Sequence, residues 1–271
     1  MNKTILITGT SSGIGKVTAL EFANKGWNVI ATQRTPEKEN DLRNHPNIFL
    51  CALDVTKPES ITEAFKQAHD RFGRIGVVVN NAGYGVDGVF EAMDDETIER
   101  QFNTNVFGLM RVTREAIGHM RAQGGGTIIQ VSSMGGKITF PLYSIYHSSK
   151  FAVEGFTESL HYELSPFNIQ LKLIEPGITA TEFNGTSRVF VKPDFTDAYD
   201  NYLQKFNEAA VKAIKNAEKP EVIAKEIYRS ATDGKSKLRY PIGAPAPMIL
   251  KLRKLLSDNL FFKMVKATYK V

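Results

Sequence analysis

Short apolar runs alternate with longer amphipathic segments along most of this chain, and this alternation restricts the folds it can adopt. The runs are rich in Val, Ile and Leu, have the length of β-strands, and occupy residues 3–8, 28–32, 48–53, 75–79, 127–131 and 170–174. Segments with helical spacing lie between them, at residues 14–25, 58–71, 95–122 and 144–164. Continuous apolar strands are buried on both faces, so we expect one doubly wound α/β domain over residues 1–271, with a parallel sheet of about seven strands.

Composition agrees with a soluble globular enzyme. No stretch is apolar over the roughly 18 residues that a membrane-spanning helix needs. The first apolar run begins at Lys3, which leaves no room for a signal peptide before the fold. The single cysteine, Cys51, lies in an apolar run and cannot form an internal disulfide, which fits a reducing compartment. We therefore expect a cytoplasmic protein in which Cys51 is a buried structural thiol.

The positive charge of the chain is concentrated at its C-terminus. Residues 251–271 hold six Lys or Arg and one Asp, so they account for the whole formal net charge of +5. Residues 1–250 are therefore neutral overall, and they lack the excess of basic residues that is typical of proteins that bind nucleic acid. We expect no nucleic-acid partner, and attraction to anions only near the C-terminus.

The first apolar run leads through a glycine-rich turn directly into the first helical segment. Glycine permits positive φ, and the free amides at a helix N-terminus stabilise a pyrophosphate. The position of the turn predicts the dinucleotide site of a Rossmann fold, although its Gly-x-x-x-Gly-x-Gly spacing departs from the common Gly-x-Gly-x-x-Gly. The candidate cofactor-binding residues here are Gly9, Ser11, Ser12, Gly13, Ile14 and Gly15.

The same turn also satisfies the Gly-x-Ser-x-Gly motif of serine hydrolases, with Ser11 as the nucleophile. A hydrolase of that fold needs a histidine late in the chain. The last histidine is His161, and none follows it in the C-terminal part of the sequence. The hydrolase interpretation is therefore disfavoured, and Ser11 is better interpreted as a hydroxyl beside a phosphate.

The end of the second run bears on the choice of cofactor. An acidic residue there would bind the ribose 2′-hydroxyl of NAD, but this sequence has Gln33 followed by Arg34. A guanidinium can pair with the 2′-phosphate of NADP, and no carboxylate stands in the acidic position to repel it. We expect NADP as the cofactor. The alternative is a solvated surface arginine, with acidic residues 37, 39 and 41 nearby.

Tyr146 and Lys150 lie four residues apart within the segment 144–164, so a helix would place both side chains on one face. A free phenol has a pKa of about 10, which a nearby ammonium lowers. The spacing thus indicates a tyrosine that can act as an acid or base, although an ordinary pair of helix residues has it too. Ser133 follows the fifth run, where open α/β sheets bind ligands, and its hydroxyl could hold a substrate oxygen.

Three further segments strengthen the pattern. They are Asn80-Asn81-Ala82-Gly83 after the fourth run, Asn105-Val106-Phe107-Gly108 within the segment 95–122, and Pro176-Gly177 after the sixth run. Together with the glycine turn, Ser133 and Tyr-x-x-x-Lys, they occur in the order found in one enzyme family. Over residues 3–180 the chain resembles the short-chain dehydrogenase/reductase family, and the Tyr-His-Ser-Ser-Lys and Glu-Pro-Gly runs resemble its steroid and retinol dehydrogenase branch.

The resemblance implies roles for these positions. Tyr146 would exchange the proton, Ser133 would orient the reacting oxygen, and Lys150 would lower the phenol pKa and bind the nicotinamide ribose. Asn105 would hold a water that relays protons. The remaining cofactor contacts implied are Asp54, Val55, Asn81, Ala82, Gly83, Pro176, Gly177, Ile178 and Thr181. Asn81 as a strand-ending cap and Thr181 as a helix N-cap remain open alternatives.

The implied reaction is hydride transfer between the cofactor and an alcohol or carbonyl group, without a metal. The candidate substrate pocket is apolar or aromatic and comprises Met134, Gly135, Phe140, Tyr143 and Phe183, which favours a hydrophobic substrate. His147 would point off the catalytic face and is interpreted as structural. The main rival is a nucleotide-sensing or regulatory protein that uses the same fold without turnover, although such a protein would not need the three catalytic residues together.

The C-terminal third is less defined by motifs. Residues 183–216 mix polar and aromatic residues, which suits a lid over the substrate, and residues 245–271 form a basic amphipathic tail. Apolar residues at 249, 252, 256, 260 and 264 have helical spacing. Three interpretations of this helix stay open: packing over the substrate pocket, packing on a neighbouring subunit, or contact with an anionic membrane surface. The segments 95–122 and 144–164 resemble the helices that pair between subunits in the family, which implies a homodimer or homotetramer.

Overall fold

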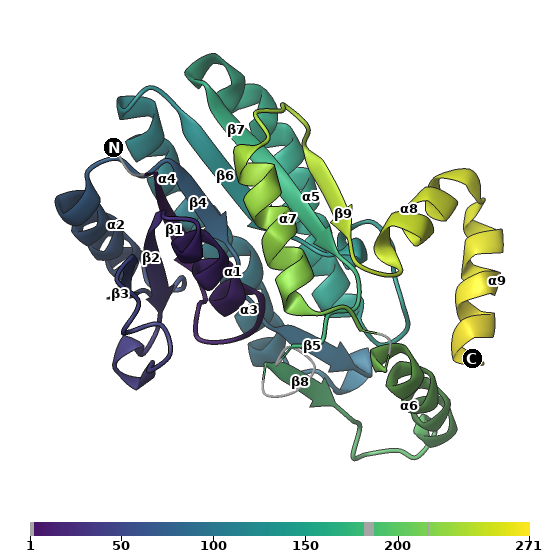
Figure 1. Ribbon diagram of the computed structural model, residues 1–271. Coiled ribbons are helices and arrows are strands. Elements are labelled where there is room, and N and C mark those ends of the chain that lie inside the picture. Colours follow the sequence, from purple (N-terminus) through teal and green to yellow (C-terminus); the bar gives the residue numbers. More distant parts are fainter. Residues whose placement is uncertain (1–2, 182–186, 216) are drawn as a thin grey trace.

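The computed structural model of the chain describes residues 3–181, 187–215 and 217–271. In this part of the chain, seven parallel strands form one sheet in the order β3-β2-β1-β4-β6-β7-β9 (Figure 1). The strands are β1 (Thr4–Thr8), β2 (Asn28–Gln33), β3 (Ile48–Ala52), β4 (Val77–Asn80), β6 (Gly126–Val131), β7 (Ile169–Pro176) and β9 (Arg239–Ile242). The predicted doubly wound parallel sheet is confirmed. Both ends of each of the six predicted runs lie within two residues of the corresponding ends of a strand.

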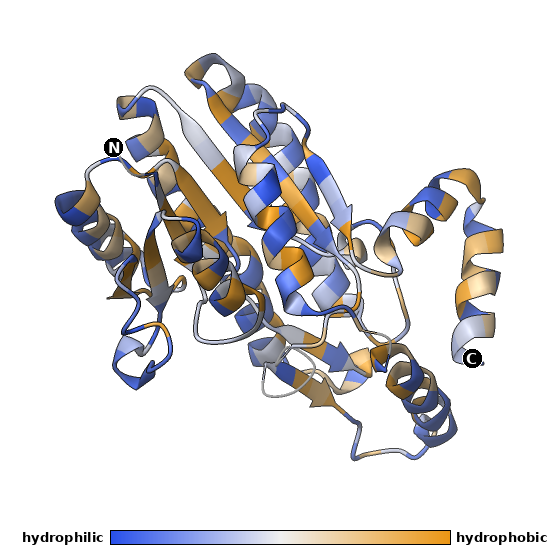
Figure 2. Cartoon of the chain, in the orientation of Figure 1, coloured by the Kyte–Doolittle hydropathy of each residue, from blue (hydrophilic) through white to orange (hydrophobic). Residues whose placement is uncertain are grey.

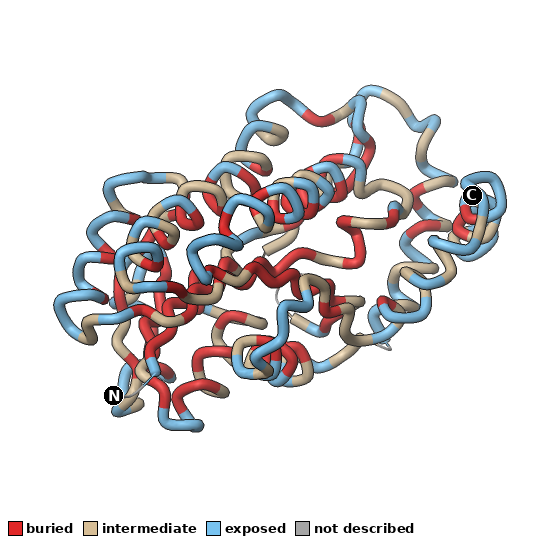
Figure 3. The backbone as a smooth tube through the Cα atoms, turned by 90° about the horizontal axis from the view of Figure 1, so that it is seen from above, coloured by how far each residue is buried: buried red, intermediate tan, exposed pale blue. Residues whose placement is uncertain are grey.

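Two layers of helices cover the sheet. One face holds α1 (Gly13–Asn24) and α7 (Pro220–Thr232), and the other holds α2 (Pro58–Phe72), α4 (Leu109–Ala122) and α5 (Ser144–Leu164). Successive side chains of a strand point to opposite faces, so Ile5 and Ile7 pack toward α1 and α7 while Leu6 packs toward α2 and α4. The strands are accordingly hydrophobic and buried along the middle of the molecule (Figures 2 and 3).

The strand order changes direction at β1, and this point positions the site. The chain runs from β1 outward to β2 and β3, then returns to place β4 on the other side of β1. In open α/β sheets a crevice forms at such a point, outside the carboxyl ends of the strands. The glycine-rich turn follows β1, and Asn81 follows β4. The two predicted cofactor segments therefore lie side by side because of the sheet topology.

The segment 95–122, expected as one helix, is divided by a change in helical pitch. It consists of α3 (Asp95–Phe102), a π-helical turn over Asn103–Gly108, and α4. The turn approaches its neighbours closely, since a Cβ on Gly108 would lie 2.8 Å from Cγ2 of Val55. The π turn carries Asn105, and such turns are frequent at functional sites.

A second, smaller sheet was not expected from the sequence. The strands β5 (Gly85–Gly88) and β8 (Arg188–Val191) pair in parallel beside the carboxyl edge of the main sheet. Arg188 Nε donates to the buried Asp87 Oδ1 at 2.6 Å, so a partly buried ion pair joins the two strands. Helix α6 (Asp200–Ile214) follows. The segment expected as a lid therefore has regular structure in its described part, while residues 183–186 and 216 lie outside the described residues.

The C-terminal tail forms two helices instead of the one that its apolar spacing suggests. They are α8 (Ala246–Leu255) and α9 (Asp258–Tyr269), and the chain turns between them. The break occurs at Leu256 and Ser257, whose backbones are extended. Met264 and Ile249 thus belong to different helices, although both pack in one apolar cluster around Phe261 and Val265. None of the described helices is long and apolar enough to cross a membrane.

Candidate active site

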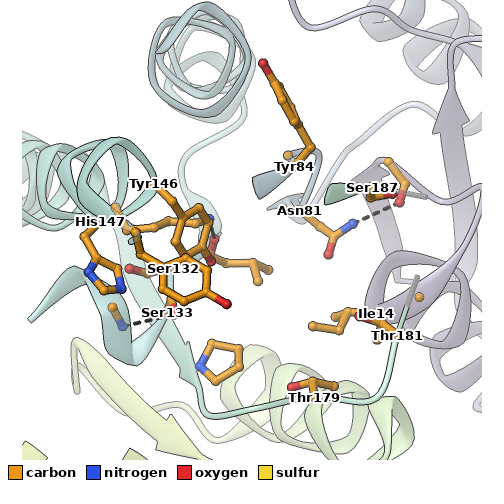
Figure 4. Close-up of a pocket in the computed structure, with 18 of the residues that line it drawn as sticks. Ile14, Asn81, Tyr84, Ser132, Ser133, Tyr146, His147, Thr179, Thr181 and Ser187 are labelled. Carbon is orange, nitrogen blue, oxygen red and sulfur yellow. Dashed lines mark hydrogen bonds between the residues drawn. The ribbon is translucent and has the colours of Figure 1, made fainter. Parts of the chain in front are cut away.

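A cleft of about 890 Å³ lies at the carboxyl edge of the sheet (Figure 4). It collects nearly all the predicted site residues, from the glycine turn after β1 to the residues after β7. Gly15 and Asn105 do not line the cleft but pack behind its wall. The predicted pocket residue Phe183 lies outside the described residues, whereas Met134, Gly135, Phe140 and Tyr143 line the cleft.

The floor of one end of the cleft is built from backbone atoms. Gly9 has a φ of +71°, and a Cβ at this position would lie 2.8 Å from the Cα of Ala82. Thr8 Oγ1 accepts hydrogen bonds from the amides of Asn81 and Ala82, each at 3.0 Å. The Asn81 side chain donates to the carbonyls of Thr8 and Gly9, at 3.0 and 2.9 Å. These hydrogen bonds hold the turn after β1 in contact with the end of β4. A ligand in the cleft would therefore contact the backbone atoms of both segments.

This end of the cleft fits a dinucleotide. The glycine turn leads into the N-terminus of α1, whose free amides favour a phosphate. Gln33 and Arg34, after β2, and Asp54, after β3, line the adjoining wall. Gln33 is buried, and its Oε1 has no hydrogen-bond partner among the described residues, so a donor on a bound ligand would satisfy it.

Asp54 is prepared to accept hydrogen bonds. Its Oδ1 accepts from the amide and the hydroxyl of Thr56, at 2.9 and 2.7 Å. Although burial opposes ionisation, these bonds and the nearby Arg34 hold the pKa of Asp54 below its usual range. The carboxylate is charged at neutral pH, which suits contact with donors on a nucleotide base.

Ser133 and Tyr146 meet in the middle of the cleft (Figure 4). Ser133 Oγ accepts a hydrogen bond from the amide of Gly135 at 3.0 Å, which fixes the side chain at the start of a short 3₁₀ turn. Burial raises the pKa of Tyr146 to about 12, and the hydrogen bond with Ser133 opposes this rise by stabilising the phenolate. The phenol is therefore a proton donor whose conjugate base needs further stabilisation.

Lys150 lies one turn along α5 from Tyr146. Its Nζ donates to the carbonyl of Val131 at 2.9 Å and lies 5.9 Å from the centre of the Tyr146 ring. Burial lowers the pKa of Lys150 to about 8, and the nearby Glu154 opposes this shift. The predicted convergence of Tyr146 and Lys150 on one helix face is present, but burial has a larger effect on the pKa of each group than their mutual interaction.

Two buried carboxylates lie behind Lys150. Glu154 is on α5, Glu175 is at the end of β7, and Arg239 Nε on β9 lies 3.1 Å from one and 3.5 Å from the other. Arg239 also binds the exposed Glu158 at 2.6 Å. Burial raises the pKa of Glu175 to about 7, and the charge of Glu154 adds to this while Arg239 opposes it. One cation therefore lies within 4 Å of three carboxylates.

Asn105 supports the cleft from behind. Its Oδ1 accepts from the amide of Tyr84 at 3.1 Å, and its Nδ2 donates to the carbonyl of the same residue at 2.9 Å. The side chain thus fixes the segment that continues from Asn81 and Gly83. Asn105 Nδ2 also lies 3.4 Å from the hydroxyl of Ser149 on α5. A role of Asn105 in holding a relay water stays a prediction.

The other end of the cleft is aromatic. Tyr143 stacks on His147 with ring centres 5.5 Å apart, and Phe140 contacts the edge of the same imidazole. His147, expected off the face of α5 that carries Tyr146 and Lys150, nevertheless lines the cleft (Figure 4). The turn that precedes α5 brings Phe140 and Tyr143 over its ring. Burial lowers the pKa of His147 to about 4, and the amide of Phe140 donates to its Nδ1 at 3.3 Å, so the ring is neutral.

The C-terminal helices complete this aromatic end. Tyr269 of α9 stacks on Phe206 of α6, with ring centres 5.5 Å apart and planes 10° from parallel, and also contacts Phe140. Other lining residues from the tail are Pro245, Ile249, Met264, Val265 and Thr268. Sequence reasoning did not include Tyr269 in the site, and Phe206 supports it from behind without lining the cleft. The apolar spacing of the tail indicated only that one of its faces would be buried.

The chain was compared with known families and relatives. The family model described as short chain dehydrogenase matches residues 3–191. An uncharacterized oxidoreductase of Bacillus subtilis, YusZ, is 41% identical over 266 residues, which cover 94% of this chain and 94% of that protein. A 3-ketodihydrosphingosine reductase of Bacteroides thetaiotaomicron is 36% identical over 217 residues, which cover 80% of this chain and 76% of that enzyme.

Solved structures show the same architecture. A short-chain dehydrogenase from Streptomyces avermitilis superposes with a TM-score of 0.85 at 30% identity, covering 98% of this chain and 96% of that one. ElxO with NADP bound gives a TM-score of 0.74 at 29% identity, covering 89% of this chain and 98% of that one. These relatives do not single out the steroid and retinol branch, which stays a prediction. The matched fold and the extent of the family match show that this chain belongs to the short-chain dehydrogenase/reductase family of oxidoreductases.

Proposed function

We propose that this protein is an NADP(H)-dependent oxidoreductase that interconverts a hydrophobic alcohol and its ketone or aldehyde. One observation carries the proposal: Ser133, Tyr146 and Lys150 line one cleft, between a backbone-built end that fits a dinucleotide and an aromatic end. A hydroxyl or carbonyl group held at the junction would lie beside both the serine and the tyrosine. An apolar remainder of the substrate would occupy the aromatic end.

The chain's own groups account for the proton chemistry. A bound nicotinamide supplies or accepts the hydride at the substrate carbon. In reduction, Tyr146 gives its phenolic proton to the carbonyl oxygen, and Ser133 donates a hydrogen bond to the same oxygen as negative charge develops there. The phenolate left behind is stabilised by the ammonium of Lys150 and is later reprotonated from solvent. Because burial holds the pKa of Lys150 at about 8, we expect reduction to slow as the pH rises above this value and the ammonium is lost.

A substitution at Tyr146 tests this mechanism. Removal of the phenolic hydroxyl in Tyr146→Phe should lower kcat/KM by about 10³-fold, the scale of general acid catalysis. NADPH affinity, measured by nicotinamide fluorescence, should change little because the glycine turn is untouched. Tyr162→Phe is a matched control, since Tyr162 lies on the same helix and is exposed to solvent. Near-normal turnover of Tyr146→Phe would overturn the mechanism.

The proposed preference for NADP rests on the residues at the end of β2 that line the wall of the cleft. Arg34 lines the cleft and is exposed, so its guanidinium can pair with a 2′-phosphate, and the neighbouring Gln33 carries no charge to repel it. Arg34→Ala should weaken NADPH binding by roughly 10- to 100-fold, as expected for a charged hydrogen bond, and leave NADH binding unchanged. Arg43→Ala is the control, because Arg43 binds backbone carbonyls outside the cleft. An equal loss for both cofactors would contradict the assignment.

We also propose that the protein is a cytoplasmic homodimer or homotetramer. The outer faces of the π turn and of α5 expose Phe107 and Phe151, two large apolar side chains on the helical segments expected to pair. Size-exclusion chromatography with light scattering should give two or four times the mass of the chain. A Phe107→Glu, Phe151→Glu variant should shift the protein toward the monomer, and an unchanged mass would place the interface elsewhere.

A further inference from the structure

The outer side of the C-terminal helix pair exposes large apolar side chains. Met248 and Leu255 of α8 are 64% and 82% exposed, and Leu260 and Phe262 of α9 are 52% and 46% exposed. The pair lies beside the main body of the molecule, with the turn between the helices directed away from the sheet (Figure 1). Four large apolar residues exposed within one short segment indicate a surface that binds something.

Basic residues are interspersed with these apolar ones. Lys251, Lys263 and Lys266 are exposed, and none of them forms an ion pair with any carboxylate of the described residues. The one acidic residue of the tail, Asp258, is engaged by Arg253 at 2.6 Å. The surface formed by Met248, Lys251, Leu255, Leu260, Phe262, Lys263 and Lys266, here called the outer tail face, is therefore cationic and apolar together.

Helix α9 separates this outer tail face from the cleft. Residues 264, 265, 268 and 269 line the cleft, and at 100° per residue they occupy one side of the helix. Lys263 lies on the opposite side, and Leu260 and Phe262 lie at the two borders between these sides. The inner side is packed against the apolar cluster of Met134 and Ile138. The same helix is thus a wall of the substrate end on one side and a free surface on the other.

We propose that the outer tail face docks the protein on the surface of an anionic lipid bilayer. Leu255, Leu260 and Phe262 would enter the interface, and Lys251, Lys263 and Lys266 would contact the phosphate and carboxylate groups of the lipids. Docking would bring the aromatic end of the cleft next to the lipid. The attachment itself does not depend on the proposed function, whereas its use in supplying an apolar substrate does.

The observations favour a lipid surface over the other occupants. A nucleic acid would match the lysines but leave the exposed leucines and Phe262 without a partner. A second copy of the chain brings no net negative charge to the lysines, because residues 1–250 carry a formal net charge of zero when the +5 of residues 251–271 is subtracted from the total of +5. An anionic bilayer satisfies both properties at once, since charge attracts the lysines and the interface takes up the apolar side chains.

Vesicle cosedimentation of the full chain tests the proposal. The vesicles are pure phosphatidylcholine or phosphatidylcholine with about 30% phosphatidylglycerol, at roughly 0.1 M salt. We expect at least a tenfold stronger partition onto the anionic vesicles and its loss near 0.5 M salt, where the charges are screened. Failure of the unmodified protein to bind anionic vesicles at the lower salt would overturn the proposal without any variant.

Two sets of variants assign the binding to the outer tail face. Lys251→Glu, Lys263→Glu, Lys266→Glu should reduce partition at least tenfold, and Leu255→Ser, Leu260→Ser, Phe262→Ser should reduce it several-fold. The matched control is Lys38→Glu, Lys212→Glu, Lys225→Glu, which changes net charge equally with exposed lysines of the body. Equal loss in the control would overturn the proposal, because it would show attraction by net charge alone.

The readouts separate this proposal from the proposed function. Circular dichroism and NADPH binding verify that each variant is folded. A protein that binds vesicles but turns over no carbonyl compound would support docking and contradict only the proposed function. If the outer tail face variants instead become monomeric by light scattering while vesicle binding is unchanged, the face is an interface between copies and the docking proposal is wrong.

Discussion

The two ends of the cleft are built in different ways. The cofactor end is made of backbone atoms from segments that directly follow β1 and β4, held by hydrogen bonds between Thr8 and Asn81. The aromatic end is made of side chains from α9 and the segment before α5, and Phe206 of α6 packs against their rings, stacked on Tyr269 and edge-on to Tyr143. A backbone-built site tolerates few changes, because a main chain cannot adopt a new rotamer. A site built of side chains can be altered residue by residue, which suits the end that selects a substrate.

Of the two ends, the backbone-built cofactor end is expected to show the larger effect. In Gly15→Ala, the new Cβ would lie 2.1 Å from the carbonyl oxygen of Gly9 and 2.5 Å from Nδ2 of Asn81, so the turn must shift. We expect a loss of about 1–3 kcal/mol in the free energy of unfolding and a comparable loss of NADPH affinity, roughly 10- to 100-fold. Thermal unfolding and fluorescence titration measure the two.

The helical Gly118 provides the control for this prediction. A Cβ there meets no atom within 4 Å, so Gly118→Ala should leave binding unchanged and raise stability slightly. Tight NADPH binding by Gly15→Ala would show that the cofactor end is more adaptable than its backbone contacts imply, and the contrast between the two ends would fail.

Glu175, near the end of β7, should make the stability of the protein depend on pH. Burial raises its pKa to about 7, so the folded protein disfavours the charged form. This unfavourable contribution is absent below the usual pKa near 4.5 and grows as the pH rises from there to about 7. Glu175→Gln should therefore raise the melting temperature more at pH 8 than at pH 5, by the equivalent of about 1–2 kcal/mol.

A second carboxylate that binds Arg239 provides a control, for which the change in stability should have the opposite sign. Glu158 also binds Arg239, but it is half exposed and this hydrogen bond lowers its pKa. Its charged form is favoured in the folded protein above its usual pKa, so Glu158→Gln should lower the melting temperature slightly at pH 8. The same sign of change in both variants would contradict the assignment of buried charge to Glu175.

The smallest effect is expected at the aromatic end of the cleft. Tyr269→Ala removes the ring that stacks on Phe206, an interaction of about 0.5–1.5 kcal/mol, so KM for an apolar substrate should rise roughly 3- to 10-fold. NADPH affinity should not change, because Tyr269 is remote from the glycine turn in the cleft. Tyr269→Phe keeps the stacked ring and should behave as the unmodified protein. A loss of cofactor affinity in Tyr269→Ala would show that the two ends are coupled.

Much of the arrangement of the proposed cofactor end, and of the proposed catalytic pair, was predictable from the sequence. Tyr146 and Lys150 share a helix, so their spacing alone places them on one face. The six apolar runs were placed correctly because a strand of this sheet is apolar wherever it is buried, and this holds whichever strand it pairs with. In contrast, β9 is only four residues long and half polar, and its pairing with β7 could not be inferred from its own pattern.

The sequence by itself determined the Rossmann sheet, the glycine turn and the placement of Tyr146 and Lys150 on one helix face, because these depend on backbone conformation and local periodicity. Only the tertiary structure decided that Arg188 pairs with Asp87 across 101 residues, that His147 faces the cleft, and that Tyr269 closes its aromatic end. Such contacts join distant segments because both are buried, and the hydrophobic effect that drives burial does not select a particular partner. The pattern of a segment can therefore show that it is buried, but only the packed fold shows against what.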